Sequence, residues 1–143
     1  MIRVIKLGEL VYENIEPVVQ EAVAFDEEGN PTQFQERWVV PNDVAELSKA
    51  IADTLVWLAG QRLKDILNKY SYYSFGDVQF YASQNDTEAQ ALLDWYKAYD
   101  DLIWSWIDND LPNYQTVEEL LQIDLKALEE DLFNQSVQTS PLP

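Results

Sequence analysis

The sequence predicts an α+β protein, in which an N-terminal β-hairpin or small antiparallel sheet is followed by three helices in a bundle or extended helical arm. Three observations predict it. The first 40 residues contain short runs rich in β-branched and aromatic residues around a Gly/Asn/Pro turn. From residue 43 onward, apolar residues recur at helical spacing. Glycine occurs only 4 times in 143 residues, which disfavours a loop-rich fold.

The β signal is clearest where two strand-like runs, PVVQEAVAF and TQFQERWVV, flank the turn sequence DEEGNP. The first residues, IRVIKL, also alternate basic and aliphatic side chains. In the TQFQERWVV run, Phe34, Trp38 and Val40 share one face, and polar residues share the other. A unit of two or three strands is marginally stable alone, so this β-rich N-terminal unit, residues 1–41, must pack on helices or on another chain.

The first helix is predicted over residues 43–69, because Asp43 and Glu46 have the spacing of a capping box and apolar residues recur behind them. A helix of this length is typical of a bundle or an elongated assembly, and Gly60 marks the place where it could break. The aromatic-rich SYYSFGDVQFYASQ that follows has no helical period and is predicted to be a loop or a short extended link.

Two further helices are predicted from their start signals. Asn85 and Glu88 have capping-box spacing and begin a helix that reaches about Asp110, where Leu-Pro stops it. A third capping box, at Thr116 and Glu119, begins the last helix, which reaches about Phe133. Both helices are amphipathic, so we expect them to pack against the first one.

These signals divide the chain into three parts. The β-rich unit is followed by a helical region, residues 42–133, and by a polar tail, residues 134–143. Nothing in the composition of the tail makes it fold alone, so we expect contacts to hold it. The three parts are expected to form one structural domain, since the chain has the length of a single domain.

Composition restricts the chemistry that the chain can perform. It contains no Cys and no His, which removes thiol nucleophiles, Cys/His zinc sites and histidine acid–base catalysis. No residue is assigned to catalysis, to a metal or to a cofactor, and the chain is expected not to be an enzyme. The net charge of −17 disfavours direct binding to nucleic acid or to an anionic membrane.

Five large aromatics and several acids are concentrated in DWYKAYDDLIWSWIDNDLP, residues 94–112. On a helix, most of its aromatics join a core-facing stripe, but Trp95 and Trp104 are predicted to lie off that stripe. A glycosidase-like carboxylate pair is disfavoured, because such pairs face each other across a cleft. Four interpretations stay open: a packed helix with solvated acids, a protein interface, a carbohydrate-binding accessory module, and an acidic DNA mimic that inhibits a nucleic-acid-binding protein.

The packed helix is the favoured explanation of the stretch, and a protein interface is compatible with it. The interface is the favoured functional interpretation, since tryptophan is common among the residues that dominate binding energy. The side chains assigned to partner binding are aromatic residues of the hairpin and of the helices: Phe34, Trp38, Trp57, Trp95 and Trp104.

Residues 89–121, AQALLDWYKAYDDLIWSWIDNDLPNYQTVEELL, resemble the C-terminal region of small tailed-bacteriophage proteins encoded near tail-fibre genes, including proteins of the tail-fibre-assembly (chaperone) type. The shared features are the W…Y…W spacing of Trp95, Tyr99 and Trp104, the Leu-Pro stop and the TVEEL helix start. The RWVVP segment in the β-rich part also fits.

The resemblance implies a non-enzymatic structural adaptor or assembly chaperone that binds a tail-fibre or baseplate protein. Such a protein works in an oligomer or complex, in the virion tail or in the host cytoplasm during assembly.

Overall fold

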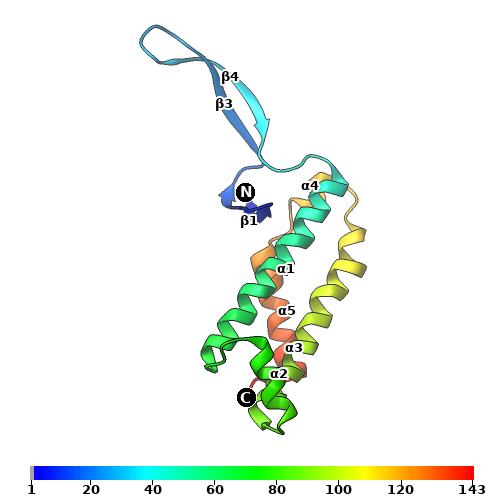
Figure 1. Ribbon diagram of the computed structural model, residues 1–143. Helices are drawn as coiled ribbons and strands as arrows, with labels where there is room; N and C mark the ends of the chain where they lie inside the picture. Colours follow the sequence, from blue (N-terminus) through cyan, green and yellow to red (C-terminus); the bar gives the residue numbers. More distant parts are fainter. Residues whose placement is uncertain (1) are drawn as a thin grey trace.

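The computed structural model describes residues 2–143 and confirms the α+β class: two antiparallel β-hairpins precede a group of packed helices (Figure 1). Strand β1 (Ile2–Leu7) pairs with β2 (Leu10–Ile15), and β3 (Val18–Phe25) pairs with β4 (Pro31–Trp38). The hairpin predicted around DEEGNP is the β3–β4 hairpin. The β1–β2 hairpin, which was not predicted as a separate unit, is closed by a two-residue turn beginning at Gly8.

Both hairpin turns depend on a glycine with positive φ. Gly8 has φ +62° and Gly29 has φ +86°, conformations that cost glycine little. In the longer turn, the Asp26 carboxylate accepts hydrogen bonds from the backbone N–H groups of Glu28 and Asn30, each at 2.9 Å. The turn chemistry that the sequence indicates is therefore present.

The first hairpin is attached to the helices through β1, which packs against α1 (Val44–Lys69) and α5 (Leu125–Thr139). Val4 and Ile5 are buried in this contact. The Lys6 backbone N–H donates to the buried Thr54 hydroxyl oxygen at 2.8 Å, which joins the strand to the middle of α1. The first hairpin thus packs on helices, as its small size requires.

The second hairpin projects away from the helices (Figure 1). Every residue of β4 is exposed. At its base, the Val39 backbone N–H donates to the Pro17 carbonyl oxygen at 2.9 Å. Packing on a helix, one of the two expected ways to stabilise the β unit, therefore does not apply to this hairpin.

Helix α1 follows the sequence prediction closely. Asp43 is its N-cap, and the Asp43 carboxylate accepts from the Glu46 backbone N–H at 3.0 Å. The helix continues through Gly60 without a break. The buried side of α1 faces β1 and the other long helices, and this packing offsets the low helix propensity of a single glycine.

The aromatic-rich link contains a helix, α2 (Phe75–Ser83), so the prediction of a loop or extended link was wrong. Ser74 is its N-cap, and its hydroxyl accepts from the Asp77 backbone N–H at 3.2 Å. Helix α2 packs against α3 near one end of the long helices, where Val78 is fully buried and Phe75 and Ala82 are half-buried. Phe75, Val78 and Ala82 have the i, i+3, i+7 spacing of a helix and face the core, so a short helical signal was present and was missed.

The N-cap of helix α3 (Thr87–Ser105) lies one residue after the predicted cap, Asn85. Asp86 is the N-cap and accepts from the Ala89 backbone N–H at 2.8 Å, whereas Asn85 adopts φ +63°. The helical path does reach Asp110, but its last five residues form a π-helical turn, followed by a 3-10 turn that contains the Leu-Pro stop.

The predicted last helix is divided into α4 (Val117–Leu120) and α5. Thr116 caps α4 as predicted, since its hydroxyl accepts from the Glu119 backbone N–H at 3.1 Å. Asp124 then caps α5, which continues to Thr139 and includes the first residues of the predicted tail. The Tyr70 hydroxyl donates to the Pro143 carbonyl oxygen at 2.6 Å, so contacts within this chain hold the tail.

Helices α1, α3 and α5 lie side by side along most of their length, with the core between them (Figure 1). Within residues 2–143, no helix is both long and apolar enough to cross a membrane.

Candidate interaction surfaces

The five aromatics assigned to partner binding lie in three environments. Phe34 and Trp38 are on the projecting hairpin, Trp57 and Trp104 are on α1 and α3, and Trp95 is inside the protein. Trp104 and the two hairpin aromatics are exposed, Trp57 is half-buried and Trp95 is fully buried.

Trp95 is a core residue, so the expectation that it lies off the core stripe of its helix was wrong. Its side chain is 0% exposed, and its indole N–H donates to the Ser136 hydroxyl oxygen at 2.9 Å. The ring stacks on Tyr99 with centroids 5.3 Å apart. Trp95 lies three residues after Leu92 and four before Tyr99, which places it within the stripe, and α5 covers it. Its ring is inaccessible to a partner in this fold.

The same interior contains a polar network that joins the three long helices. Glu129 of α5 accepts from the Arg62 guanidinium of α1 at 2.8 and 3.0 Å, and from the Tyr99 hydroxyl of α3 at 2.7 Å. The Arg62 guanidinium also lies over the Phe133 ring, 4.2 Å from its centroid. The hydrogen bond to Glu129 raises the pKa of Arg62, and burial together with that carboxylate raises the pKa of Tyr99.

This network was missed by the sequence prediction, although a signal for it exists. Glu129 lies four residues after Leu125 and three before Leu132, on the buried side of α5. A carboxylate at such a position requires a cation or several donors. Because Glu129 accepts from both Arg62 and Tyr99 and so pairs their polar groups within the chain, we interpret the network as stabilising the fold and not as a ligand site.

The exposed face of the β3–β4 hairpin is the first candidate surface. Phe34 and Trp38 are 59% and 43% exposed and lie on one face of β4. Their cross-strand neighbours are Ala22 and Val18, so small apolar side chains extend the same face. The prediction that Phe34 and Trp38 share an apolar face agrees with this arrangement, whereas Val40, predicted on the same face, lies beyond the end of β4 and is buried in the core.

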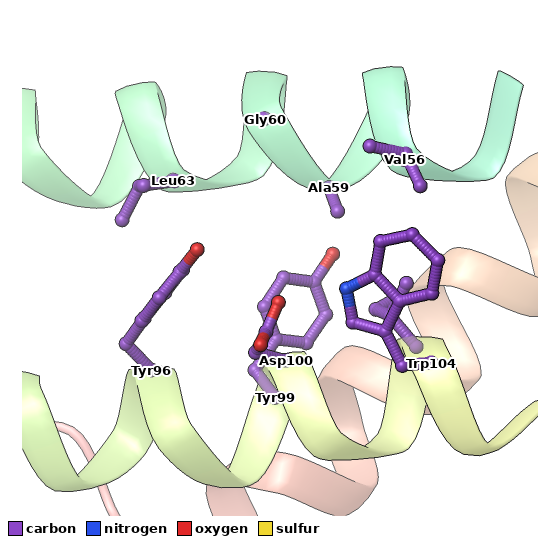
Figure 2. A pocket seen from close by; sticks show the side chains of 9 residues that line it. Val56, Ala59, Gly60, Leu63, Tyr96, Tyr99, Asp100 and Trp104 are labelled. Atoms are coloured by element: carbon purple, nitrogen blue, oxygen red, sulfur yellow. The ribbon is translucent and has the colours of Figure 1, made fainter. Parts of the chain in front are cut away.

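The second candidate surface is a groove between α1 and α3, with a volume of about 160 Å³ (Figure 2). Its α1 side is apolar and consists of Val56, Ala59, Gly60 and Leu63. Its α3 side combines aromatic, aliphatic and acidic residues: Tyr96, Tyr99, Asp100, Ile103 and Trp104. We call it the α1–α3 groove.

Three polar groups point into the α1–α3 groove (Figure 2): the Tyr96 hydroxyl, the Asp100 carboxylate and the Trp104 indole N–H. Burial, and then the negative charge of Asp100, raise the pKa of Tyr96. Trp104 is 47% exposed and forms one end of the groove. Trp57 does not line it, and instead packs its half-buried ring against the core.

A third, more open hollow of about 500 Å³ lies beside the π-helical turn. The aromatic rings of Trp106 and Tyr114 form part of it, with centroids 6.3 Å apart, and Asp110 and Glu119 contribute carboxylates. Trp106 is almost entirely buried, so it presents little ring surface for stacking.

Comparison of the chain with protein-family models, with curated proteins and with solved structures found no match. The candidate surfaces are therefore interpreted from their own geometry and charge.

Proposed function

We propose that this chain is a non-enzymatic bacteriophage tail protein, which binds a tail-fibre or baseplate protein as a structural adaptor or assembly chaperone. The observation that carries the binding role is the β3–β4 hairpin, which projects from the helices and exposes an aromatic face. The phage context rests on the resemblance of residues 89–121 to small tail-fibre-associated proteins.

The hairpin has the properties of a surface that is completed by a partner. A two-stranded hairpin is marginally stable in water without further packing. Phe34 and Trp38 expose large rings whose burial is worth about 1.5–3 kcal/mol for a side chain of this size. Each strand of the two-stranded sheet also has one outer edge that no strand within residues 2–143 pairs with. An extended segment of a partner could add to such an edge.

Charge supports a partner that is not a second hairpin. Residues 17–38 contain five acids and one base, a net charge of −4, so two hairpins would repel each other. Residues 71–143 contain fourteen acids and two bases, a net charge of −12. The field of the whole chain therefore attracts basic surfaces and opposes acidic ones.

The test is binding to the tail-fibre and baseplate subunits encoded beside this chain, measured by calorimetry on purified proteins. The double variant Phe34→Ala/Trp38→Ala should weaken binding by about 30-fold or more, which corresponds to loss of about 2 kcal/mol from a central aromatic anchor. The matched control is Gln33→Ala/Gln35→Ala, which changes the opposite face of the same strand and should leave the affinity unchanged.

Unchanged affinity of the aromatic variant would show that the hairpin face is not the binding surface. Failure to bind any fibre or baseplate subunit would contradict the proposed function. Competition with duplex DNA for a DNA-binding protein, weakening steeply with salt, would support the DNA-mimic alternative instead. Measurable heat on addition of host polysaccharide would support the carbohydrate-binding alternative.

A further inference from the structure

We infer that the α1–α3 groove receives one arginine side chain of a protein partner, with Asp100 as its counter-ion. This inference rests on the proposed protein-binding function and specifies the chemistry of one contact. It concerns a surface formed by the helices, distinct from the β3–β4 hairpin.

The first argument is the state of Asp100. Its carboxylate is half-buried in the groove, yet within residues 2–143 it makes no hydrogen bond or ion pair. Glu129, the buried carboxylate nearby in the core, has three donors by contrast. A partly desolvated carboxylate without a donor favours the approach of a cation.

The second argument is the pair of rings that flank this carboxylate. Tyr96, Asp100 and Trp104 are spaced four residues apart on α3, so they lie along one side of the helix. Figure 2 shows the two rings on either side of the Asp100 carboxylate, with the indole N–H directed toward the middle of the groove. A cation that reaches Asp100 therefore meets the Tyr96 ring on one side and the edge of the indole on the other. A guanidinium suits this arrangement, because it can stack on the Tyr96 ring while its N–H groups bind the Asp100 carboxylate.

The third argument is the opposite wall, where Gly60 leaves open space. A Cβ placed on Gly60 would meet no atom within 4 Å, so packing inside the chain does not require a glycine at this position. The neighbouring Ala59 and Leu63 are apolar and half-buried. An aliphatic stem can lie along this wall while its charged end reaches Asp100.

Size and charge identify the occupant as a side chain. The groove holds about 160 Å³, less than the roughly 300–1,000 Å³ of pockets that enclose a small-molecule ligand. The net charge of −17 favours the approach of a basic protein segment. The chain's own Arg62 lies on the same helix, but its guanidinium is bound to Glu129, so it does not supply the cation for the groove.

The experiment titrates the full chain with three peptides: acetyl-Gly-Ser-Arg-Ser-Gly-amide and the same peptide with citrulline or with lysine in place of arginine. Citrulline retains the shape of arginine without its charge. Binding is read from the ¹⁵N-labelled indole N–H signal of Trp104, assigned by its absence in Trp104→Phe. The arginine peptide should shift this signal in a saturable way, and the citrulline peptide should bind at least tenfold more weakly. Equal binding of the arginine and citrulline peptides would overturn the inference, as would tighter binding of the lysine peptide.

Three variants locate the interaction. Asp100→Asn should weaken arginine-peptide binding at least tenfold, whereas Asp101→Asn removes the same charge from an exposed neighbour outside the groove and should change it less than twofold. Gly60→Leu should fill the groove and abolish the Trp104 shift, with folding checked by circular dichroism. If Gly60→Leu does not fold, the comparison of the two aspartate variants decides whether the arginine binds in the groove. Equal weakening by both aspartate variants would mean attraction to diffuse acidic charge, and would overturn the inference.

The outcome is separable from that of the hairpin experiment. Phe34→Ala/Trp38→Ala leaves the groove intact and should bind the arginine peptide normally. Loss of peptide binding in Asp100→Asn with normal hairpin-dependent binding would support the groove and leave the hairpin result unaffected. Absence of any peptide binding by the unmodified chain would overturn the groove inference alone.

Discussion

Replacing Glu129 with leucine should destabilise the protein strongly, because this carboxylate is the common acceptor for two helices. It is 7% exposed and accepts two hydrogen bonds from Arg62 and one from Tyr99. Glu129→Leu replaces the carboxylate with an apolar side chain of similar size. It leaves a partly buried guanidinium without its counter-ion and a buried phenol hydroxyl without its acceptor.

The expected loss in the free energy of unfolding follows from these two groups, which are left without a hydrogen-bonding partner. Removing one member of a buried ion pair costs about 3–5 kcal/mol. The Arg62 side chain is 27% exposed and can turn toward water, so the cost of leaving it unpaired lies at the lower end of this range. The unpaired Tyr99 hydroxyl adds about 1–3 kcal/mol, and burial of the new leucine offsets part of the sum. We expect a net loss of about 3 kcal/mol in the free energy of unfolding.

The assay is equilibrium unfolding in urea at pH 7, followed by tryptophan fluorescence, which reports on the buried Trp95. Adding Arg62→Met to Glu129→Leu should recover part of the loss, since the uncompensated charge is then gone. Adding Tyr99→Phe as well should bring the triple variant to within about 1 kcal/mol of the unmodified protein. Glu130→Leu, the same change at the exposed neighbouring position, serves as the control and should have little effect.

Two results would refute this reasoning. One is a loss below about 1 kcal/mol for Glu129→Leu, which would place the network in a well-solvated environment. The other is strict additivity of the Arg62 and Glu129 substitutions, which would mean that the two residues are not coupled.

Two further predictions concern pH and helix propensity. The pKa of Tyr99 is raised by burial and by its hydrogen bond to Glu129, so above about pH 10 the unfolded chain loses this proton first. The free energy of unfolding should therefore be maintained below that pH and fall as pH rises further, by at most about 1.4 kcal/mol per pH unit for this group. Urea unfolding between pH 9 and 11 measures this fall, and it should be less steep in Tyr99→Phe. Gly60→Ala should raise the free energy of unfolding by about 1 kcal/mol, because alanine favours the helix and its Cβ meets no atom within 4 Å; a loss of stability would show that the α1–α3 groove is closed in solution.

Local signals in the sequence identified the second hairpin and most helix starts. DEEGNP predicted its turn, and Asp43 and Thr116 cap helices where their spacing indicates. Helix α2 was missed, because its helical signal is short: Phe75, Val78 and Ala82 give only two turns of helical spacing among exposed aromatic residues. The division of the last helix into α4 and α5 also escaped prediction, since the apolar residues of both pieces continue one apparent period.

The candidate surfaces were only partly predictable. Phe34 and Trp38 are exposed on the hairpin and Trp104 lines a groove, but Trp95 is in the core. Trp95 and Trp104 have similar sequence surroundings, both being tryptophans among acids on one helix. The spacing of Trp95 from Leu92 and Tyr99 was a local signal for the core stripe, whereas the packing of α5 over Trp95 but not over Trp104 is a property of the tertiary structure.

The sequence by itself determined the class of fold, the absence of thiol and imidazole chemistry, and the acidic character that any partner must match. These depend on composition and on short-range spacing, which act through local backbone preferences and net charge. Only the tertiary structure decided that one hairpin packs on α1 while the other projects, that Arg62, Tyr99 and Glu129 meet, and that Asp100 is left without a partner between two rings. The first two outcomes depend on contacts between residues 30 or more positions apart, whose geometry is set by the packing of whole helices. The rings beside Asp100 are four positions away on the same helix, but their partial burial depends on the packing of α1 against α3.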